Sequence, residues 1–279
     1  LCCSVFITTA DELINLFKGA TGNTLETDIK LLDHLEFSQD LITDPLGVSD
    51  DGKCVAFNGL FQGNGLSIRC LTMGLGWFGH AGLFCSLKNA IIENLVIDSS
   101  CSFIGDDAGA LSVSVTGSLV VKHVTNNAAV SGKYRVGGFI GYVDGLEQQT
   151  VISFEDCVNN GNVSGSDNYA GGFVGVVFRN TDMTISNSVN NGNVIGNGDY
   201  VGGFIGHIYS SSASHSTALD IMNSANKGSV SSKQGMACGF VCVDMECNSN
   251  VITTIKSSIN KGTVNATTNG YGITNNITE

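Results

Sequence analysis

One glycine-rich phrase recurs along the chain and limits the folds that are open to it. It reads "VGGFIGYV" from residue 136, "AGGFVGVV" from 170, "VGGFIGHI" from 201 and, in altered form, "ACGFVCVD" from 237. A second phrase reads "CVNNGNVSG" from 157, "SVNNGNVIG" from 188, "SANKGSVSS" from 224 and "SINKGTVNA" from 258, with an altered copy from 123. Equivalent positions of this second phrase lie 34, 31, 36 and 34 residues apart. A repeat of this length predicts a chain of stacked, similar units.

Each unit contains three apolar patches separated by glycine or Asn-Gly turns. In residues 171–201 these are "GFVGVV", "MTISNSV" and "NVIG", each long enough for a short strand. The chain has one proline, 36 glycines and 42% hydrophobic residues, which favours short strands around a sizeable core. We therefore predict an all-β fold: a right-handed parallel β-helix (β-solenoid) with three strands per coil and about six or seven coils.

Stacked coils place equivalent residues in columns, and the columns predict which side chains are buried. One interior column should hold the phenylalanines of the glycine phrase: Phe139, Phe173, Phe204 and Phe240. Since successive side chains of a strand point to opposite faces, the alternate positions should point outward. They would form an apolar binding wall of Ile140, Tyr142, Val174, Val176, Ile205 and His207. An exposed wall of this kind marks a binding surface unless an inserted loop covers it.

The first third of the chain differs from the repeats. The stretch "ITTADELINLF" from residue 7 predicts a short capping helix, with Thr9 as its N-cap and two acidic residues in its first turn. Residues 1–107 hold fourteen Asp and Glu against five Lys and Arg. We expect residues 1–80 to form the cap and first coils, and residues 81–279 to form the repeat coils of the same β-helix, a single domain cut from a longer chain.

The repeat phrases resemble those of a known group. The pattern "GGFVG…I…N.GNV.G" is similar to the GLUG-type repeats of pectin-lyase-like β-helix surface proteins found in bacteria and in protists such as trichomonads. Upstream, "FNGLFQGNGLSIRCLTM" from residue 57, "AGLFCSL" and "IIENLVI" resemble the first coils of that group. The resemblance covers nearly the whole chain and implies the β-helix fold. It does not imply one activity, because these repeats occur in adhesins, in proteases and in proteins without known activity.

Some β-helix proteins cleave polysaccharides, so the polar residues were weighed as catalytic groups. Fragments resembling the polygalacturonase set occur at Asn180–Asp182, Asp106–Asp107, His80 and Arg69, but in reversed order and spread over several coils. A general acid and base must lie within about 10 Å of each other across a glycosidic bond. The alternatives of a calcium loop at Asp98 and Asp106–Asp107 and of a zinc site at His207 and His215 lack the ligand patterns of such sites. We therefore expect no enzyme activity, no metal and no cofactor.

Cysteines, sequons and charge bear on location and partners. We expect most of the ten cysteines to be small buried residues, with one or two disulfides as the alternative, and Cys238 and Cys242 to be too far apart to pair if their strand is extended. Three sequons, at Asn162, Asn265 and Asn276, suit a secreted or surface protein. The net charge of −12 argues against nucleic acid, and no apolar run approaches the roughly 20 residues of a membrane-spanning helix.

Together these observations predict a non-catalytic binding or adhesion module that is secreted or displayed at the cell surface. Its partners would be a host-cell glycan or protein or another copy of itself, with no nucleic acid and no membrane insertion. Two alternatives remain: a carbohydrate-active enzyme, a hydrolase or lyase whose site is not recognised, and a purely structural stalk.

Overall fold

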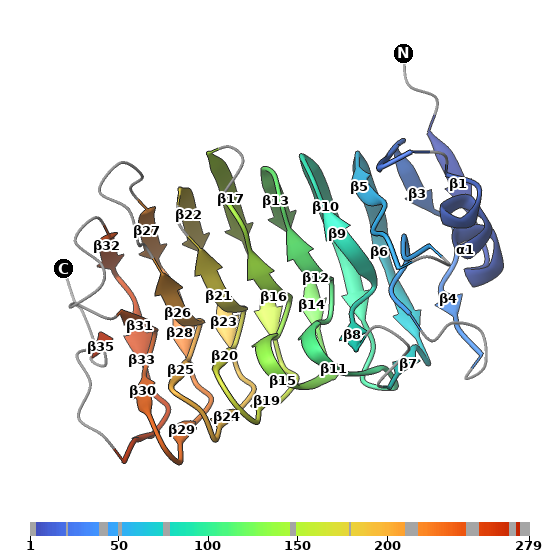
Figure 1. Ribbon diagram of the computed structural model, residues 1–279. Coiled ribbons are helices and arrows are strands. Elements are labelled where there is room, and N and C mark those ends of the chain that lie inside the picture. Colours follow the sequence, from blue (N-terminus) through green and yellow to red (C-terminus); the bar gives the residue numbers. More distant parts are fainter. Residues whose placement is uncertain are drawn as a thin grey trace.

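The chain winds into a parallel β-solenoid of about seven coils with one short helix, as the sequence predicts (Figure 1). The computed structural model describes residues 4–20, 22–38, 44–49, 52–74, 79–145, 149–178, 180–209, 217–243, 251–267 and 272–273. Strands of successive coils pair in register along three sheets, so that each sheet runs the length of the molecule.

The first sheet has fifteen described strands. They are β1 Val5–Ile7, β3 Ile29–Leu31, β4 Leu35–Glu36, β6 Leu60–Arg69, β10 Ala90–Ile97, β13 Leu119–Lys122, β14 Thr125–Asn126, β17 Thr150–Glu155, β18 Val158–Asn159, β22 Thr181–Ser186, β23 Val189–Asn190, β27 Thr217–Met222, β28 Ala225–Asn226, β32 Val251–Lys256 and β33 Ile259–Asn260.

The second sheet has eleven described strands and the third has nine. The second contains β7 Thr72–Met73, β8 His80–Ala81, β11 Ser102–Gly109, β15 Ala129–Gly137, β19 Val163–Gly165, β20 Tyr169–Gly171, β24 Val194–Gly196, β25 Tyr200–Gly202, β29 Val230–Ser232, β30 Met236–Cys238 and β34 Val264–Asn265. The third contains β2 Thr24–Glu26, β5 Ala56–Asn58, β9 Phe84–Leu87, β12 Ser112–Val115, β16 Ile140–Val143, β21 Val174–Phe178, β26 Ile205–Tyr209, β31 Val241–Val243 and β35 Gly272–Ile273.

A full repeat coil contributes five short strands to these three sheets, which is more than the three strands predicted. The coil from β17 to β21 places two strands in the first sheet, two in the second and one in the third. The described strand pairs are parallel except for β31 with β35. Each coil therefore bends more often than the three apolar patches suggest.

The phenylalanine column is buried, as predicted. Phe139, Phe173, Phe204 and Phe240 have no exposed surface, and consecutive rings lie 4.8–5.8 Å apart between centroids. Phe154 of β17 packs edge-on against Phe173 at 5.4 Å, which joins the first sheet to this column. These aromatic contacts form the core of the repeat coils.

The helix α1, Ala10–Lys18, covers the first coil (Figure 1). Thr9 is its N-cap, as predicted, and Glu12 completes a capping box by accepting hydrogen bonds from the backbone of Thr8 and Thr9. These bonds, those from Thr8 foremost, lower the pKa of Glu12. The ring of Phe17 lies 6.1 Å from Phe57 and 5.7 Å from Phe84, so the helix closes the end of the core.

The corner between the first and second sheets is held by a buried column of asparagines. We call this the asparagine column: Asn126, Asn159, Asn190, Asn226 and Asn260. The amide Nδ2 of each of the first four donates to the Oδ1 of the asparagine in the next coil, at 2.7–2.9 Å. Each also donates to the backbone carbonyl two residues further along its own chain. The column thus satisfies the polar groups that the corner buries.

Candidate functional site

The predicted binding wall is not exposed. Ile140, Val174, Val176 and Ile205 have no exposed surface and His207 has 2%, while Tyr142 is half-buried. The exposure predicted for this set is therefore wrong for five of the six residues, and only Tyr142 is partly exposed.

The reason lies at the junction of the second and third sheets, where the backbones of the two sheets approach closely. A Cβ atom on Gly175 would lie 2.5 Å from the carbonyl oxygen of Gly141 and 2.6 Å from the backbone nitrogen of Val136. The glycine therefore makes room for the neighbouring backbone. The second sheet covers what would otherwise be the outer surface of the third.

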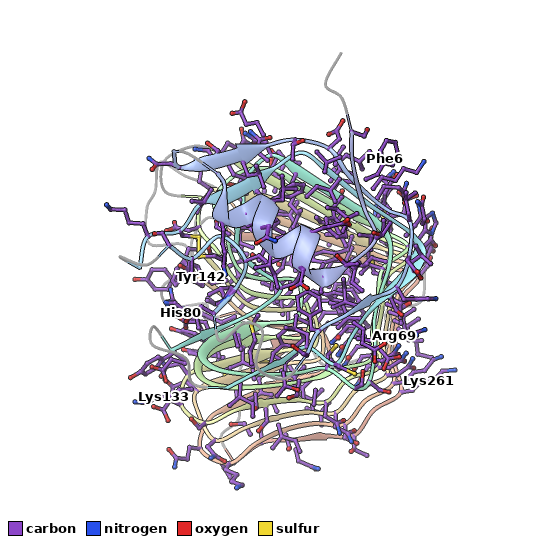
Figure 2. All side chains as sticks on the ribbon, turned by 90° about the vertical axis from the view of Figure 1, so that its right-hand side faces the viewer. Phe6, Arg69, His80, Lys133, Tyr142 and Lys261 are labelled. Atoms are coloured by element: carbon purple, nitrogen blue, oxygen red, sulfur yellow. A yellow bond between two sulfur atoms is a disulfide. The ribbon has the colours of Figure 1, made fainter. Side chains whose placement is uncertain are left out.

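Two columns of side chains meet along this junction. On the second sheet we name the variable column, which is His80, Asp107, Arg135, Tyr169, Tyr200 and Met236. On the third sheet lies the facing column, which is Ser86, Ser114, Tyr142, Val176, His207 and Cys242. Figure 2 shows His80 and Tyr142 on the same side of the molecule, seen along the solenoid. Unlike the core columns, these two change residue type from coil to coil.

Aromatic rings gather in the middle of this junction. We call them the aromatic patch: Tyr142, Tyr169, Phe178, Tyr200, His207 and Tyr209. The His207 ring stacks on Tyr200 at 4.1 Å and on Tyr169 at 5.5 Å between centroids. His207 itself is buried, Tyr209 is 36% exposed, and the other four rings are half-buried. The patch therefore presents ring surface to solvent across three coils.

Tyr142, Phe178 and Tyr209 form the outer edge of the patch. Their rings meet edge-to-face, with centroids 6.4 Å and 6.2 Å apart. The stacked pair Tyr169 and Tyr200 lies 5.9 Å apart. Tyr169 with Tyr200, and Phe178 with Tyr209, are register partners in parallel strands, which places the rings of each pair at a similar spacing.

A charged cluster adjoins the aromatic patch. Asp107 is buried and accepts two hydrogen bonds from the guanidinium of Arg135, of which the bond from Nε is 2.7 Å long. Arg135 also lies over the ring of Tyr142, with its Cζ 3.8 Å from the centroid. Burial by itself would lower the pKa of Arg135, but the hydrogen bonds and charge of Asp107 outweigh it, so the pKa is raised. Arg135 therefore stays cationic.

His80 completes this cluster. Its Nδ1 lies 3.6 Å from Oδ2 of Asp107, and its side chain is 37% exposed. The pair comes from neighbouring coils, because His80 of β8 and Asp107 of β11 are register partners. Two of the four fragments that the sequence raised as catalytic candidates thus meet, although their order along the chain argued against it.

The other candidate residues do not join them. Asp182 lies on the first sheet, in β22, and Asp107 on the second, in β11, three coils earlier. The described part of the chain contains no cluster of three His, Cys, Asp or Glu side chains suited to a metal ion. His215, one of the two histidines considered for zinc, lies outside the described residues.

Two of the three predicted glycosylation positions can be placed. Asn162 precedes β19 and Asn265 ends β34, and both residues are exposed. Asn276 lies outside the described residues. Exposure is necessary for glycosylation, so the two sequons remain candidates.

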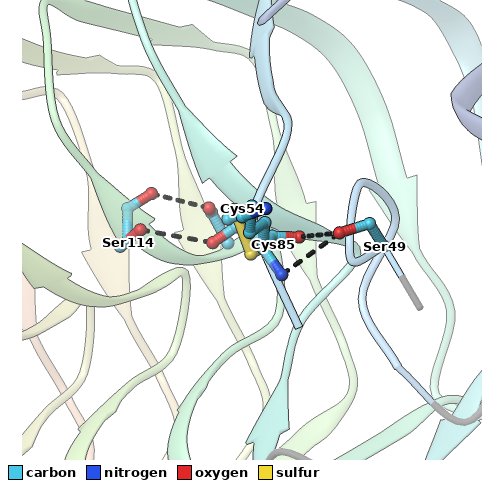
Figure 3. The surroundings of a disulfide bond; sticks show 6 residues. Ser49, Cys54, Cys85 and Ser114 are labelled. Carbon is cyan, nitrogen blue, oxygen red and sulfur yellow. Dashed lines mark hydrogen bonds between the residues drawn. A yellow bond between two sulfur atoms is a disulfide. The ribbon is translucent and has the colours of Figure 1, made fainter. Parts of the chain in front are cut away.

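Cysteine pairing differs from the prediction. Of the seven described cysteines, four form two disulfides, Cys54–Cys85 and Cys238–Cys242. The chain turns at Gly239 and Phe240 between β30 and β31, so the Cα atoms of Cys238 and Cys242 are 5.5 Å apart and the assumption of an extended strand was wrong. The Cys54–Cys85 bond ties the loop before β5 to β9 (Figure 3), where Ser114 donates a 3.3 Å hydrogen bond to the carbonyl of Cys85.

Most of the aromatic patch was not found from the sequence. Tyr142 and His207 were singled out, but Tyr169, Tyr200 and Tyr209 were not. A signal was present: Tyr169 and Tyr200 each stand two residues before the Gly-Gly pair, at equivalent positions of successive repeats. The turn at that pair brings them against residues seven positions later, such as His207 on Tyr200.

Comparisons with known proteins show the fold but not a family. No protein-family model matches the chain, so the GLUG-type resemblance is not confirmed. Over 142 residues the chain is 30% identical to halomucin of Haloquadratum walsbyi, a match that spans 43% of this chain and 2% of halomucin. A crystal structure from Bacteroides ovatus, described as a "putative immunoglobulin A1 protease", is similar over 97% of this chain and 84% of that one, with a TM-score of 0.62 and 17% identity.

One prediction has to be corrected in the light of the structural neighbour. The sequence led us to expect that the chain is not an enzyme, yet the neighbour with the same β-helix fold carries the name of a protease. At 17% identity this likeness concerns the fold alone, so the expectation that the chain is not an enzyme is withdrawn and no activity follows from the neighbour. Among the described residues no helix is long and apolar enough to cross a membrane.

Proposed function

We propose that this protein is an extracellular or surface-displayed binding module that contacts its partner through the aromatic patch. The observation that carries the proposal is the partial exposure of five aromatic rings on one junction of the solenoid, over three successive coils. Tyrosine supplies a large contact area together with a polar hydroxyl, and such rings often dominate the affinity of an interface.

Support for an extracellular location comes from the disulfides and sequons. Disulfides persist in oxidising compartments and are rare in the cytosol. Two of them in one domain, and two exposed sequon asparagines, fit a secreted chain. Similarity to GLUG-type surface proteins, as suggested by the repeat phrases, agrees with this proposal.

The test uses the protein with Tyr169, Tyr200 and Tyr209 all replaced by leucine. The parent and this triple variant are applied to an array of surface glycans and extracellular proteins, with Tyr134→Leu as the matched control, since Tyr134 is also 36% exposed but lies outside the patch. We expect the triple variant to lose at least tenfold in affinity, about 1.4 kcal/mol. The control should bind as the parent does.

Equal binding of the parent and the triple variant to every partner would overturn the proposal. Folding of the variant is checked by circular dichroism. The single variant Tyr209→Ser, which changes the most exposed ring of the patch, gives a second test if the triple variant does not fold.

A second candidate function, cleavage of a polysaccharide, is favoured by one observation. The imidazole of His80 lies 3.6 Å from the carboxylate of Asp107 beside the aromatic patch, and the His80 side chain is 37% exposed. A screen of polysaccharides for reducing ends or unsaturated products, with parent protein and His80→Asn, tests this candidate. Activity that His80→Asn does not lower would argue against these residues.

A further inference from the structure

We infer that the aromatic patch binds arginine side chains of a basic segment in a partner protein, an inference that rests on the binding role proposed above. Three features of the structure support it: the chain's own cations on its tyrosines, the residue types that follow Arg135 in its column, and the charge of the molecule.

The first feature is an arginine already bound on the same junction. The guanidinium of Arg135 lies over the Tyr142 ring at 3.8 Å while Asp107 holds its other edge. A second cation, Lys133, lies 4.6 Å above the ring of Tyr134. Arginine prefers to stack on aromatic faces, and its planar group is weakly hydrated, which lowers the cost of removing it from water. The chain thus displays within itself the contact that we infer for a partner.

The second feature is the change of residue type along the variable column. The register partner of Arg135 in the next coil is Tyr169, and in the following coil it is Tyr200. The aromatic surface therefore continues past Tyr142 through Phe178 and Tyr209, whereas the positive charge of Arg135 is not repeated at these register positions. The later coils offer rings of the kind that Arg135 covers in its own coil.

The third feature is electrostatic. The chain carries a net charge of −12, so a cationic segment is attracted and a second copy of the chain is repelled. Carboxylates act on the junction directly: burial and then the charge of Asp199 raise the pKa of Tyr169, and Asp144 is among the groups that raise the pKa of Arg135. A guanidinium at the patch would meet the partly exposed rings and this negative potential.

The experiment compares a cation with its neutral isostere. The probe is a peptide of alternating arginine and serine, and its control has every arginine replaced by citrulline, which keeps the shape and most hydrogen-bond donors but carries no charge. Binding is measured by isothermal titration with the parent, with the triple variant Tyr169→Leu, Tyr200→Leu and Tyr209→Leu, and with Tyr134→Leu. None of these substitutions changes the net charge.

We expect the parent to bind the arginine peptide at least tenfold more tightly than the citrulline peptide, and the triple variant to lose at least tenfold for the arginine peptide alone. Tyr134→Leu should match the parent. If the triple variant binds both peptides as tightly as the parent does, the binding is a general attraction of unlike charges and the inference is overturned. Equal binding of both peptides by the parent would overturn it as well.

The outcome separates this inference from the proposed function. If the triple variant loses a glycan partner on the array while the arginine and citrulline peptides bind equally, the patch is a binding surface and the cationic partner is wrong. If the parent sediments as a dimer and the triple variant as a monomer, the partner is a second copy and the inference is likewise overturned. If the array shows no loss and the peptides show none, both proposals fail.

Discussion

The asparagine column and the variable column differ in how their residues repeat. At the corner between the first and second sheets, asparagine returns in five successive coils. At the junction of the second and third sheets, the variable column holds His, Asp, Arg, Tyr, Tyr and Met in turn. The first four asparagines are buried and Asn260 is half-buried, and each one is hydrogen-bonded to the asparagine of a neighbouring coil. The residues of the variable column, apart from the buried Asp107, lie partly in solvent, and their type changes from coil to coil. A uniform column marks a position that the fold constrains, and a variable column at a surface is free to acquire function.

The largest effect on stability should come from the glycines at the junction of the second and third sheets, where the backbones of the two sheets approach closely. Gly175→Ala would place a Cβ 2.5–2.9 Å from backbone atoms of Gly141 and Val136, so the backbones themselves must move. We expect a loss of about 3 kcal/mol in the free energy of unfolding, measured by urea denaturation. Gly74→Ala is the control, because a Cβ there meets nothing within 4 Å. Equal stability of the two variants would contradict the close approach of the sheets.

The asparagine column should be the next most sensitive. Asn190→Ala removes donors to Gly192 and Asn226 and an acceptor for Asn159, all in a buried site. The expected loss is about 2 kcal/mol, since buried partners are left unsatisfied. Asn191→Ala is the matched control: Asn191 also bonds to an asparagine of the previous coil, at 2.8 Å, but is exposed. A control that costs as much would show that burial does not decide the effect.

The phenylalanine and asparagine columns also show how much of the fold can be predicted from the sequence. The repeat spacing and the phenylalanine column predicted the fold, because a buried column needs the same residue in each coil and is therefore visible as a repeat. Asn160 and Asn191, of the Asn-Gly turns, form an exposed ladder, and the sequence analysis did not single out the buried asparagine before each of them. The sequence does distinguish the two positions, because the first asparagine returns in all five copies of the second phrase, whereas the second is replaced by Lys227 and Lys261 in two of them.

The candidate site was harder to predict, and the reason is geometric. The wall of Ile140, Val174 and Ile205 was placed outside because alternation in a single strand says nothing about a second sheet lying against it. The backbone also takes a left-handed conformation once before each asparagine of the column, at His123, Asp156, Asn187, Asn223 and Ser257. Four of these residues lie directly before the second phrase, and none of them belongs to its Asn-Gly pair. The candidate site depends on where the chain bends within each coil. The repeat pattern predicts the length of a coil but not the positions of these bends.

A smaller effect on stability is expected at Cys157, which stands in a column that otherwise consists of serines and lies two residues before the asparagine column. Ser188, Ser224 and Ser258 accept a backbone hydrogen bond from the preceding coil, and Cys157 precedes them in this column. Burial raises the pKa of the Cys157 thiol to about 12 from its usual 9.0. Above pH 9 the unfolded chain loses this proton while the folded chain keeps it, so stability falls as the pH rises.

Cys157→Ser should remove this dependence. Between pH 8 and pH 10 the parent should lose about 1.4 kcal/mol more than the variant, as calculated from the two pKa values. The measurement is the difference in urea stability of each protein at the two pH values, which cancels the titration of groups that both share. A difference of the same size in parent and variant would show that the thiol is not the titrating group.

The smallest effect on stability should come from the variable column itself. Tyr200→Met introduces the residue that Met236 supplies at the register-equivalent position of the next coil, so the strand can hold it without a change of backbone. The ring of Tyr200 stacks on Tyr169 and His207, but it is half-buried, and methionine can cover much of the same apolar surface. We expect a loss of less than about 1 kcal/mol in urea denaturation. A loss as large as that of Asn190→Ala would mean that the junction is constrained by the fold, and its variation from coil to coil could then no longer be taken as the mark of a functional surface.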